Sequence, residues 1–198
     1  MIKVDTIPTA LFHLDRMLYC NGYLQEINRG SFEGEQVYRL QHPPVSITIE
    51  DPLNLYDMPK TITIPEIDHY CAELYNPDKP DSADYTYGER IEPQLVHIID
   101  MLLETPGTNQ AIINIGRPED RELEHPPCLQ TMHFLLFEGK LHLSVLMRSN
   151  DIGSAFLLNL YGFAYFGWGV AAAVNQKFGS LIYQCTAPHY YSHSISEG

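Results

Sequence analysis

The sequence has 198 residues, of which 44% are hydrophobic, enough for a sizeable core, and we expect residues 1–198 to form a single domain. A formal net charge of −13 argues against nucleic acid or a membrane surface as a partner, and it permits a small anionic ligand only where basic residues gather locally. The four cysteines have no C-x-x-C or framework spacing, and the N-terminus is not typical of a signal peptide, so we expect a cytoplasmic protein with reduced thiols.

The first half of the chain predicts two helices and one strand. Apolar residues at helical spacing predict a helix that ends at Asn21-Gly22. The polar segment 28–34 is typical of a loop, and alternation over residues 45–49 predicts a strand. After an irregular segment, residues 66–75 predict a short helix.

The second half predicts a longer helix and several strands. Residues 91–103 predict an amphipathic helix that ends before Pro106-Gly107. We expect its apolar stripe to be buried: Ile91, Leu95, Ile98, Ile99, Leu102 and Leu103. Residues 111–115 predict a strand, followed by an exposed connection after Ile115. Residues 180–184 predict another strand, before a turn at His189. Residues 132–137 and 140–147 predict a hairpin closed at Glu138-Gly139.

Residues 152–176 contain no charged side chain, which is long enough to suggest a membrane span. Four glycines and three amide side chains interrupt the run, and no basic flank supports a topology. We therefore expect a helix buried on all sides in a soluble protein.

Helices and strands that mix without regular βαβ alternation indicate an α+β fold around a mixed, mostly antiparallel sheet. The strands at 132–137 and 140–147 are apolar on both faces, which indicates a sheet covered on both sides.

Cys128 follows two prolines and leads into the first strand of the predicted hairpin, and Arg148 follows its second strand. If the strands pair, the thiol and the guanidinium lie close together, and the positive charge favours the nucleophilic thiolate. The alternative is a buried structural cysteine.

Several motifs resemble the thymidylate synthase family, which includes the pyrimidine-nucleotide hydroxymethylases. They are RGS at 29–31, YTYGERI at 85–91, AIINIG and PED within 111–120, PPC at 126–128, RSND at 148–151, Asn159, and His189-x-Tyr191. The likeness is to a compact, archaeal-like branch, and it implies a thymidylate synthase-like homodimer in which two sheets pack face to face.

The resemblance implies that Cys128 adds to C6 of a pyrimidine. Arg148 would activate the thiol and hold the substrate phosphate, with Ser149 and Arg29 as further phosphate ligands. His189 and Tyr191 would hold the ribose.

For the base and the one-carbon donor, the resemblance implies three further groups. Asn159 would read the O4 and N3–H edge of uracil. Asp151 would meet the pterin of the co-substrate, 5,10-methylenetetrahydrofolate. Tyr87 would assist proton removal, and an acid on the helix at 66–75 would organise water, with Glu73 preferred over Glu66.

The chain departs from the family pattern at the phosphate site, because Asn109 and Gln110 stand where paired arginines are usual. Arg39, Arg90 or Arg117 would have to compensate. No metal site is expected, since His189 and His193 have helical metal spacing but no further ligands nearby.

Three functions remain open. The leading one is folate-dependent C5 methylation of a uracil nucleotide such as dUMP. The second is a 5-hydroxymethylase acting on dCMP, CMP or dUMP, and the third is a non-catalytic nucleotide-binding dimer.

Overall fold

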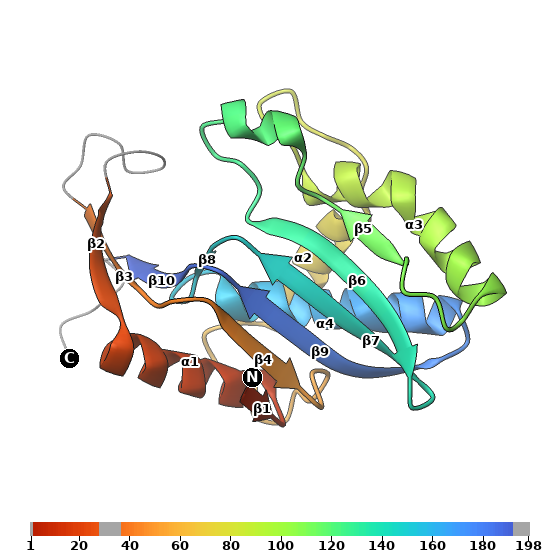
Figure 1. Ribbon diagram of the computed structural model, residues 1–198, viewed down its shortest axis with the longest axis horizontal. Helices are drawn as coiled ribbons and strands as arrows, with labels where there is room; N and C mark the ends of the chain where they lie inside the picture. The colour runs from red at the N-terminus through yellow and green to blue at the C-terminus, as the bar shows by residue number, and fades with distance from the viewer. Residues whose placement is uncertain (1, 28–36, 192–198) are drawn as a thin grey trace.

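The computed structural model describes residues 2–27 and 37–191, which contain two mixed sheets and four α-helices (Figure 1). The larger sheet has the order β1-β4-β9-β7-β6-β5: β1 (Ile2–Val4), β4 (Val45–Ile49), β9 (Lys177–Cys185), β7 (Lys140–Met147), β6 (Leu129–Phe137) and β5 (Ile112–Asn114). The smaller has the order β2-β3-β10-β8: β2 (Tyr23–Ile27), β3 (Val37–Gln41), β10 (Pro188–Tyr191) and β8 (Asn150–Asp151). The helices are α1 (Ile7–Asn21), α2 (Ile64–Tyr75), α3 (Tyr87–Glu104) and α4 (Phe156–Ala173), with a short 3-10 helix, η1 (Pro118–Glu122).

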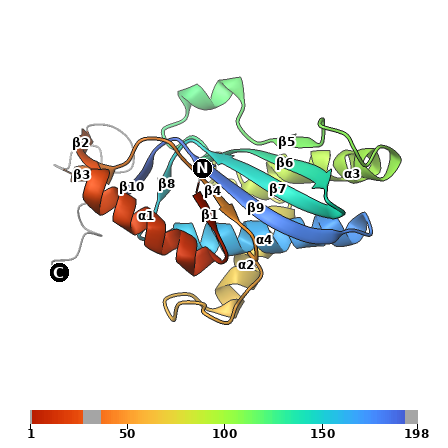
Figure 2. The ribbon, with the colours of Figure 1, turned by 60° about the horizontal axis from the view of Figure 1, so that its bottom comes forward.

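The helices cover one face of the larger sheet. Helix α4 runs behind β7 and β9, and α2 packs against α4 on the side away from the strands (Figures 1 and 2). Ten of the residues of α4 are buried, and the helix is apolar almost all round. By length and composition alone α4 could cross a membrane, but most of it is buried inside the protein, as is usual for a core helix.

The β6–β7 hairpin has the predicted boundary at residues 138–139. Glu138 and Gly139 both have positive φ, 50° and 70°, which matches the turn whose twist suits a two-residue hairpin. Phe137 pairs with Lys140, so the register is set directly at the turn. This turn aligns the start of β6 with the end of β7, at the far end of the hairpin, where Cys128 and Arg148 lie.

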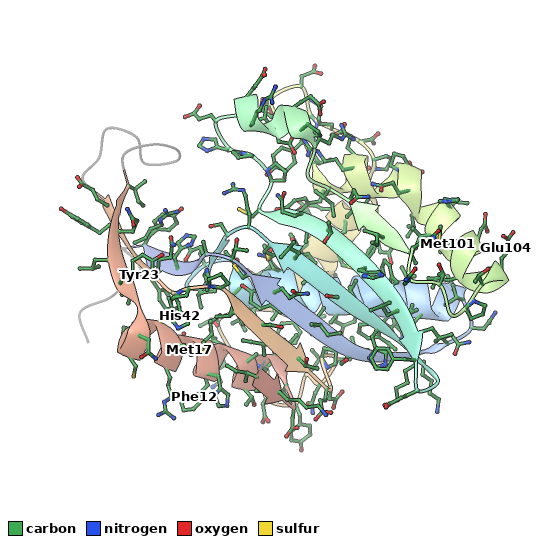
Figure 3. All side chains as sticks on the ribbon, in the orientation of Figure 1. Phe12, Met17, Tyr23, His42, Met101 and Glu104 are labelled. Carbon is green, nitrogen blue, oxygen red and sulfur yellow. The ribbon has the colours of Figure 1, made fainter. Side chains whose placement is uncertain are left out.

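Helix α1 shows how sequence periodicity places a helix against the sheet. Thr6 caps its N-terminus, with its hydroxyl accepting a hydrogen bond from the backbone N–H of Thr9. Leu14 and Leu18 are fully buried on one face. Phe12 points outward from the other face and is 58% exposed (Figure 3).

The α+β class and the mostly antiparallel pairing are confirmed, since among the strands that the structure describes only the β1–β4, β7–β9 and β8–β10 pairs are parallel. Three details of the prediction are wrong. Leu103 is 49% exposed, outside the buried stripe of α3, and Trp168 is 53% exposed, so α4 is not buried on all sides. His189 lies in β10 rather than in a turn.

The described residues leave the face of the larger sheet opposite α4 uncovered (Figure 1). Cover on both sides, which the face-to-face homodimer would supply, stays a prediction. Ile182 and Gln184 of β9 point to this open face and are half-buried, while Leu181, Tyr183 and Cys185 point toward α4 and are buried. Alternation along β9 therefore separates a closed core face from an open one.

Candidate active site

The ends of the predicted hairpin, the smaller sheet and α4 meet at a cavity of about 570 Å³. Cys128 precedes β6, Arg148 follows β7, His189 and Tyr191 come from β10, and Asn159 comes from the first turns of α4. All five line the cavity, together with Ser149 and Asp151. Residues up to 63 positions apart in the sequence thus converge on one volume, the size of a small-molecule site.

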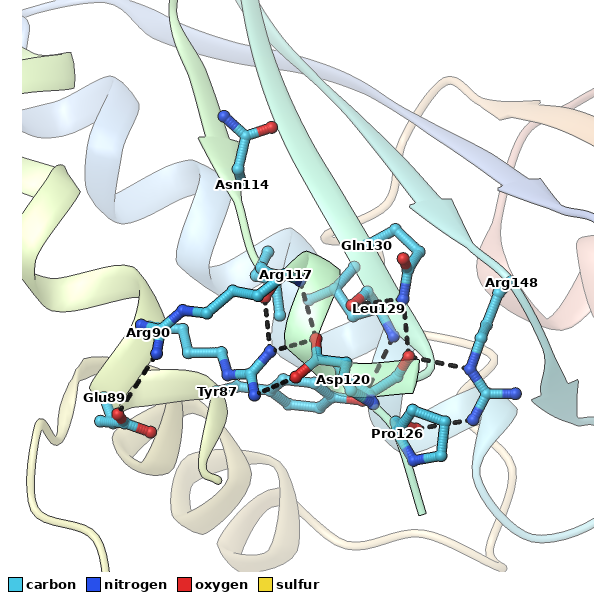
Figure 4. Close-up of polar contacts among 12 residues, drawn as sticks. Tyr87, Glu89, Arg90, Asn114, Arg117, Asp120, Pro126, Leu129, Gln130 and Arg148 are labelled. Carbon is cyan, nitrogen blue, oxygen red and sulfur yellow. Dashed lines mark hydrogen bonds and ion pairs between the residues drawn. The ribbon is translucent and has the colours of Figure 1, made fainter. Parts of the chain in front are cut away.

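Cys128 and Arg148 are held together through the backbone. The backbone N–H of Arg148 donates to the carbonyl of Cys128 at 2.8 Å. The guanidinium donates back across the hairpin, from Nε to the Pro127 carbonyl at 3.0 Å and from a terminal nitrogen to the Pro126 carbonyl at 2.6 Å (Figure 4). The PPC segment is therefore clamped to the arginine that follows β7.

The charge state of Cys128 differs from the expectation. Burial raises the pKa of the Cys128 thiol above its ordinary value, and the nearby positive charge of Arg148 offsets only part of that effect. The resting site therefore holds a thiol, and a proton must leave before the sulfur can attack.

A buried ion pair supports the connection that leads to Cys128. Arg90 of α3 and Asp120 of η1 form two parallel hydrogen bonds of 2.6 Å (Figure 4). Arg90 also donates to the Ile115 carbonyl at 2.7 Å, and its guanidinium lies 4.6 Å from the ring centroid of Tyr85. The connection after Ile115, expected to be exposed, thus contains a buried carboxylate that fixes η1 to α3.

His189 is oriented by its neighbours. Its Nδ1 lies 3.0 Å from the Ala187 carbonyl and 3.4 Å from Ser149 Oγ. Since a carbonyl only accepts, Nδ1 carries the hydrogen, and Nε2 is left as an acceptor. Nε2 is buried without a hydrogen-bond partner in the described chain, and burial lowers the pKa of His189, which keeps the ring neutral.

Asp151 lies in β8, just before α4, and Asn159 lies in the first turns of α4. Asp151 accepts hydrogen bonds from Gly153 N at 3.0 Å and from Ser154 Oγ at 2.5 Å. Asn159 Nδ2 donates to Asn150 Oδ1 at 3.2 Å, which leaves its own oxygen for other contacts. Both side chains line the cavity and present acceptor atoms.

Tyr87 lines the cavity, and its hydroxyl accepts a hydrogen bond from Leu129 N at 3.3 Å, directly beside the nucleophile. Burial raises its pKa well above the ordinary value. The hydroxyl therefore stays protonated and can donate.

The structure does not bring the two predicted acids into the cavity. Glu73 is exposed on α2 and lies 3.2 Å from His69, and it lines a neighbouring cavity that shares Tyr85 and Tyr87 with the first. Glu66 instead accepts hydrogen bonds from Thr63 N and Oγ1, both at 2.7 Å, which caps α2 and lowers the pKa of Glu66. The preference for Glu73 over Glu66 stays a prediction, because among the described residues the carboxylates that line the main cavity are Asp151 and Glu124.

Of the arginines considered as replacements for the family pair, only Arg39 lines the cavity. Its Nε is buried and has no hydrogen-bond partner within the described residues. Arg90 is taken up by Asp120, and Arg117 lies 3.8 Å from Glu89 outside the cavity.

Sequence reasoning missed several lining residues: Arg121, Glu124 and His125. They lie in a charged connection that reads as ordinary surface, although its position just before PPC was a usable signal. Neither Asn109 nor Gln110 lines this cavity. Arg29 and His193 lie outside the described residues, and within those residues no group of three or more metal-ligating side chains gathers.

Comparisons with known proteins agree with this geometry. A family model described as "Thymidylate synthase" matches residues 67–197. A protein of Methanosarcina barkeri named "Putative thymidylate synthase" is 30% identical over 98% of this chain and 90% of its own length. A protein of the same name from Methanococcoides burtonii is 25% identical over 98% of this chain and 90% of its own length. A Listeria monocytogenes protein named "Thymidylate synthase" is 29% identical over 56% of this chain and 35% of its own.

Proposed function

Because this chain belongs to the thymidylate synthase family, we propose that it methylates C5 of a uracil nucleotide, most simply dUMP, through a covalent bond from Cys128 to C6. The observation that carries the proposal is the convergence of Cys128, Arg148, Ser149, Asp151, Asn159, His189 and Tyr191 on one cavity. These residues carry the family motifs, and folding brings them together from the ends of the β6–β7 hairpin, β8, α4 and β10.

The anionic end of the nucleotide fits the basic part of the cavity. Arg39, Arg121 and Arg148 line it in a chain of net charge −13, which is the local gathering of cations that a small anion needs. Arg148 and Ser149 are the proposed phosphate ligands, with Arg29 as a third. Arg39 takes the place of the missing arginine pair, since it lines the cavity and its buried Nε has no hydrogen-bond partner among residues 2–27 and 37–191.

The rest of the nucleotide meets hydrogen-bonding groups of the required sense. His189 Nε2 is an acceptor, so it accepts from a ribose hydroxyl, with Tyr191 beside it at a ring-centroid distance of 4.8 Å. The Asn159 amide contacts the base edge through its free oxygen and remaining N–H. Binding of both ends places C6 of the ring near the sulfur.

The chemistry begins when the Cys128 proton leaves and the sulfur bonds to C6. Electron density then develops at C5, which forms a bond to the one-carbon unit. The co-substrate 5,10-methylenetetrahydrofolate would supply that carbon, whose two bonds to folate nitrogens break, and the hydride that reduces it to methyl, so that dihydrofolate leaves. The C5 proton leaves through water held by Tyr87, with Glu73 beyond the tyrosines as the proposed acid, and expulsion of the Cys128 thiolate completes the turnover. Asp151 would hold the pterin, because its acceptor oxygens line the same cavity.

We also propose a cytoplasmic homodimer in which the open faces of two larger sheets meet. That face carries half-buried apolar side chains, Leu135, Leu146 and Ile182, next to Phe137, which is 46% exposed. A second copy would cover them and supply the sheet packing that the described chain lacks. Sedimentation velocity on wild type and Ile182→Glu tests this: loss of a dimer in the variant is expected, and a monomeric wild type contradicts it.

The function is tested by tritium release from C5-labelled dUMP and other pyrimidine nucleotides with methylenetetrahydrofolate. Wild type should release tritium, Cys128→Ala should abolish release while remaining folded, and Cys71→Ala, a half-buried cysteine on α2, should be unaffected. A fully active Cys128→Ala removes the covalent mechanism. Product carrying only hydroxymethyl, with tetrahydrofolate released, would make the protein a hydroxymethylase. Nucleotide binding without any turnover would leave a non-catalytic binder.

A further inference from the structure

The amide of Asn159 is held by a second amide. Asn150 Oδ1 accepts a hydrogen bond from Asn159 Nδ2 at 3.2 Å. Asn150 is itself only 2% exposed and sits in β8, between Ser149 and Asp151 of the cavity lining. Asn150 also lines the cavity, so a nearly fully buried side chain of the cavity wall holds the proposed base-reading residue.

The row of hydrogen bonds continues away from the cavity in one direction. Asn150 Nδ2 donates to Tyr183 Oη at 3.2 Å, and Tyr183 is fully buried in β9. Because the Nδ2 of Asn150 donates to the tyrosine hydroxyl, the oxygen of the same amide is the atom that faces Asn159.

This row distinguishes the two orientations of the Asn159 amide. Oxygen and NH₂ are almost the same size, so space alone does not choose between them. Reversal of Asn159 would set two carbonyl oxygens, of Asn159 and Asn150, against each other in a partly buried site and would break the hydrogen bond between the two amides.

We propose that Asn150, backed by Tyr183, is a positioning residue that fixes the Asn159 amide in one orientation and so makes the site select uracil over cytosine. The inference rests on the proposed function, in which Asn159 contacts the base. Uracil offers an N–H donor and a carbonyl acceptor along this edge, whereas cytosine offers a ring-nitrogen acceptor and an amine donor, in the opposite order. An amide whose oxygen and N–H have fixed places can therefore match only one of the two bases fully.

The test measures dissociation constants for dUMP and dCMP by titration calorimetry, and the ratio of the two is the readout. Wild type should prefer dUMP. Tyr183→Phe removes the hydroxyl that orients Asn150, and Asn150→Leu removes the acceptor for Asn159, so in both variants the preference should fall about tenfold. A tenfold change corresponds to about 1.4 kcal/mol, the size of one buried hydrogen bond.

Two controls separate positioning from general damage. Asn150→Asp keeps an acceptor for Asn159, so it should retain the base preference even where overall affinity drops. Tyr161→Phe removes another hydroxyl from a fully buried tyrosine, one outside the cavity, and should leave the ratio unchanged. Loss of affinity for both bases by the same factor is what a merely structural role would produce.

The inference is overturned if wild type binds both nucleotides equally or binds neither. It is also overturned if Tyr183→Phe and Asn150→Leu keep the wild-type ratio, or if Asn150→Asp loses it as fully as Asn150→Leu. Because binding is measured without folate, these outcomes are independent of turnover. A ratio that changes as expected in a protein that never releases tritium would support the inference and reject the proposed methylation.

Discussion

Replacing Asp120 by Asn should destabilise the protein by about 3 kcal/mol, because it breaks a buried ion pair while leaving the cation in place. In the folded protein both Asp120 oxygens accept 2.6 Å hydrogen bonds from Arg90. The two side chains are 11% and 4% exposed, so water cannot replace the lost partner.

The size of the destabilisation follows from the loss of the carboxylate charge, which the amide in Asp120→Asn does not carry. Loss of one partner from a buried pair costs about 3–5 kcal/mol, and the lower end applies because the Asn oxygen still accepts one bond and Arg90 keeps the Ile115 carbonyl. Glu122→Gln is the matched control, since it removes the same charge from an exposed pair, Arg121 Nε to Glu122 Oε1 at 3.7 Å with side chains 79% and 76% exposed. That change should stay within about 0.5 kcal/mol.

Urea unfolding followed by circular dichroism measures both variants. The pH dependence gives an independent check: the pairing lowers the pKa of Asp120 below its ordinary 3.8, so the folded value lies below the unfolded one. The stabilisation is then complete above about pH 4 and is lost as the pH falls through the folded pKa. The difference in free energy of unfolding between wild type and Asp120→Asn should become smaller in that acidic range. If Asp120→Asn unfolds within 0.5 kcal/mol of wild type at about pH 7, the ion pair does not stabilise η1 as argued.

Three further outcomes are expected. In the unliganded protein, the rate at which iodoacetamide alkylates Cys128, measured by mass spectrometry, should be low at neutral pH. The rate should increase only above pH 9.0, because burial raises the pKa of the thiol from that value. Rapid labelling at pH 7 would mean a resting thiolate. Asn159→Asp should shift kcat/KM from uracil toward cytosine nucleotides, since an added acceptor faces the exocyclic amine, and a wild type that already prefers cytosine would contradict this reading of the base. Gly88→Ala should lower the melting temperature by several degrees, because the added Cβ would lie 1.9 Å from the Asn76 carbonyl oxygen. Gly107→Ala should not lower it, because an added Cβ there meets no atom within 4 Å. Equal melting temperatures for the two variants would show that α2 and α3 can separate at no cost.

The local features of this protein were determined by its sequence alone. The hairpin turn at Glu138-Gly139 follows from a glycine that tolerates positive φ between two apolar runs, and α4 follows from an uncharged run too long for a strand. The order and spacing of PPC, RSND, Asn159 and His189-x-Tyr191 also indicated the family, because each motif carries its own chemistry.

The tertiary structure decided which of these groups act on one another. Strands β2, β3 and β10 were not predicted, since each has at most five residues, and β10 pairs with β3 far along the chain. The sequence could not show that Glu73 lies on an exposed face of α2, 3.2 Å from His69 and outside the main cavity. In the sequence, Asn150 of RSND has no evident role, and only folding brings it into hydrogen-bonding contact with Tyr183, 33 residues away. Local periodicity records only which face of an element is apolar, whereas the orientation of a buried amide depends on partners that only packing brings within hydrogen-bonding distance.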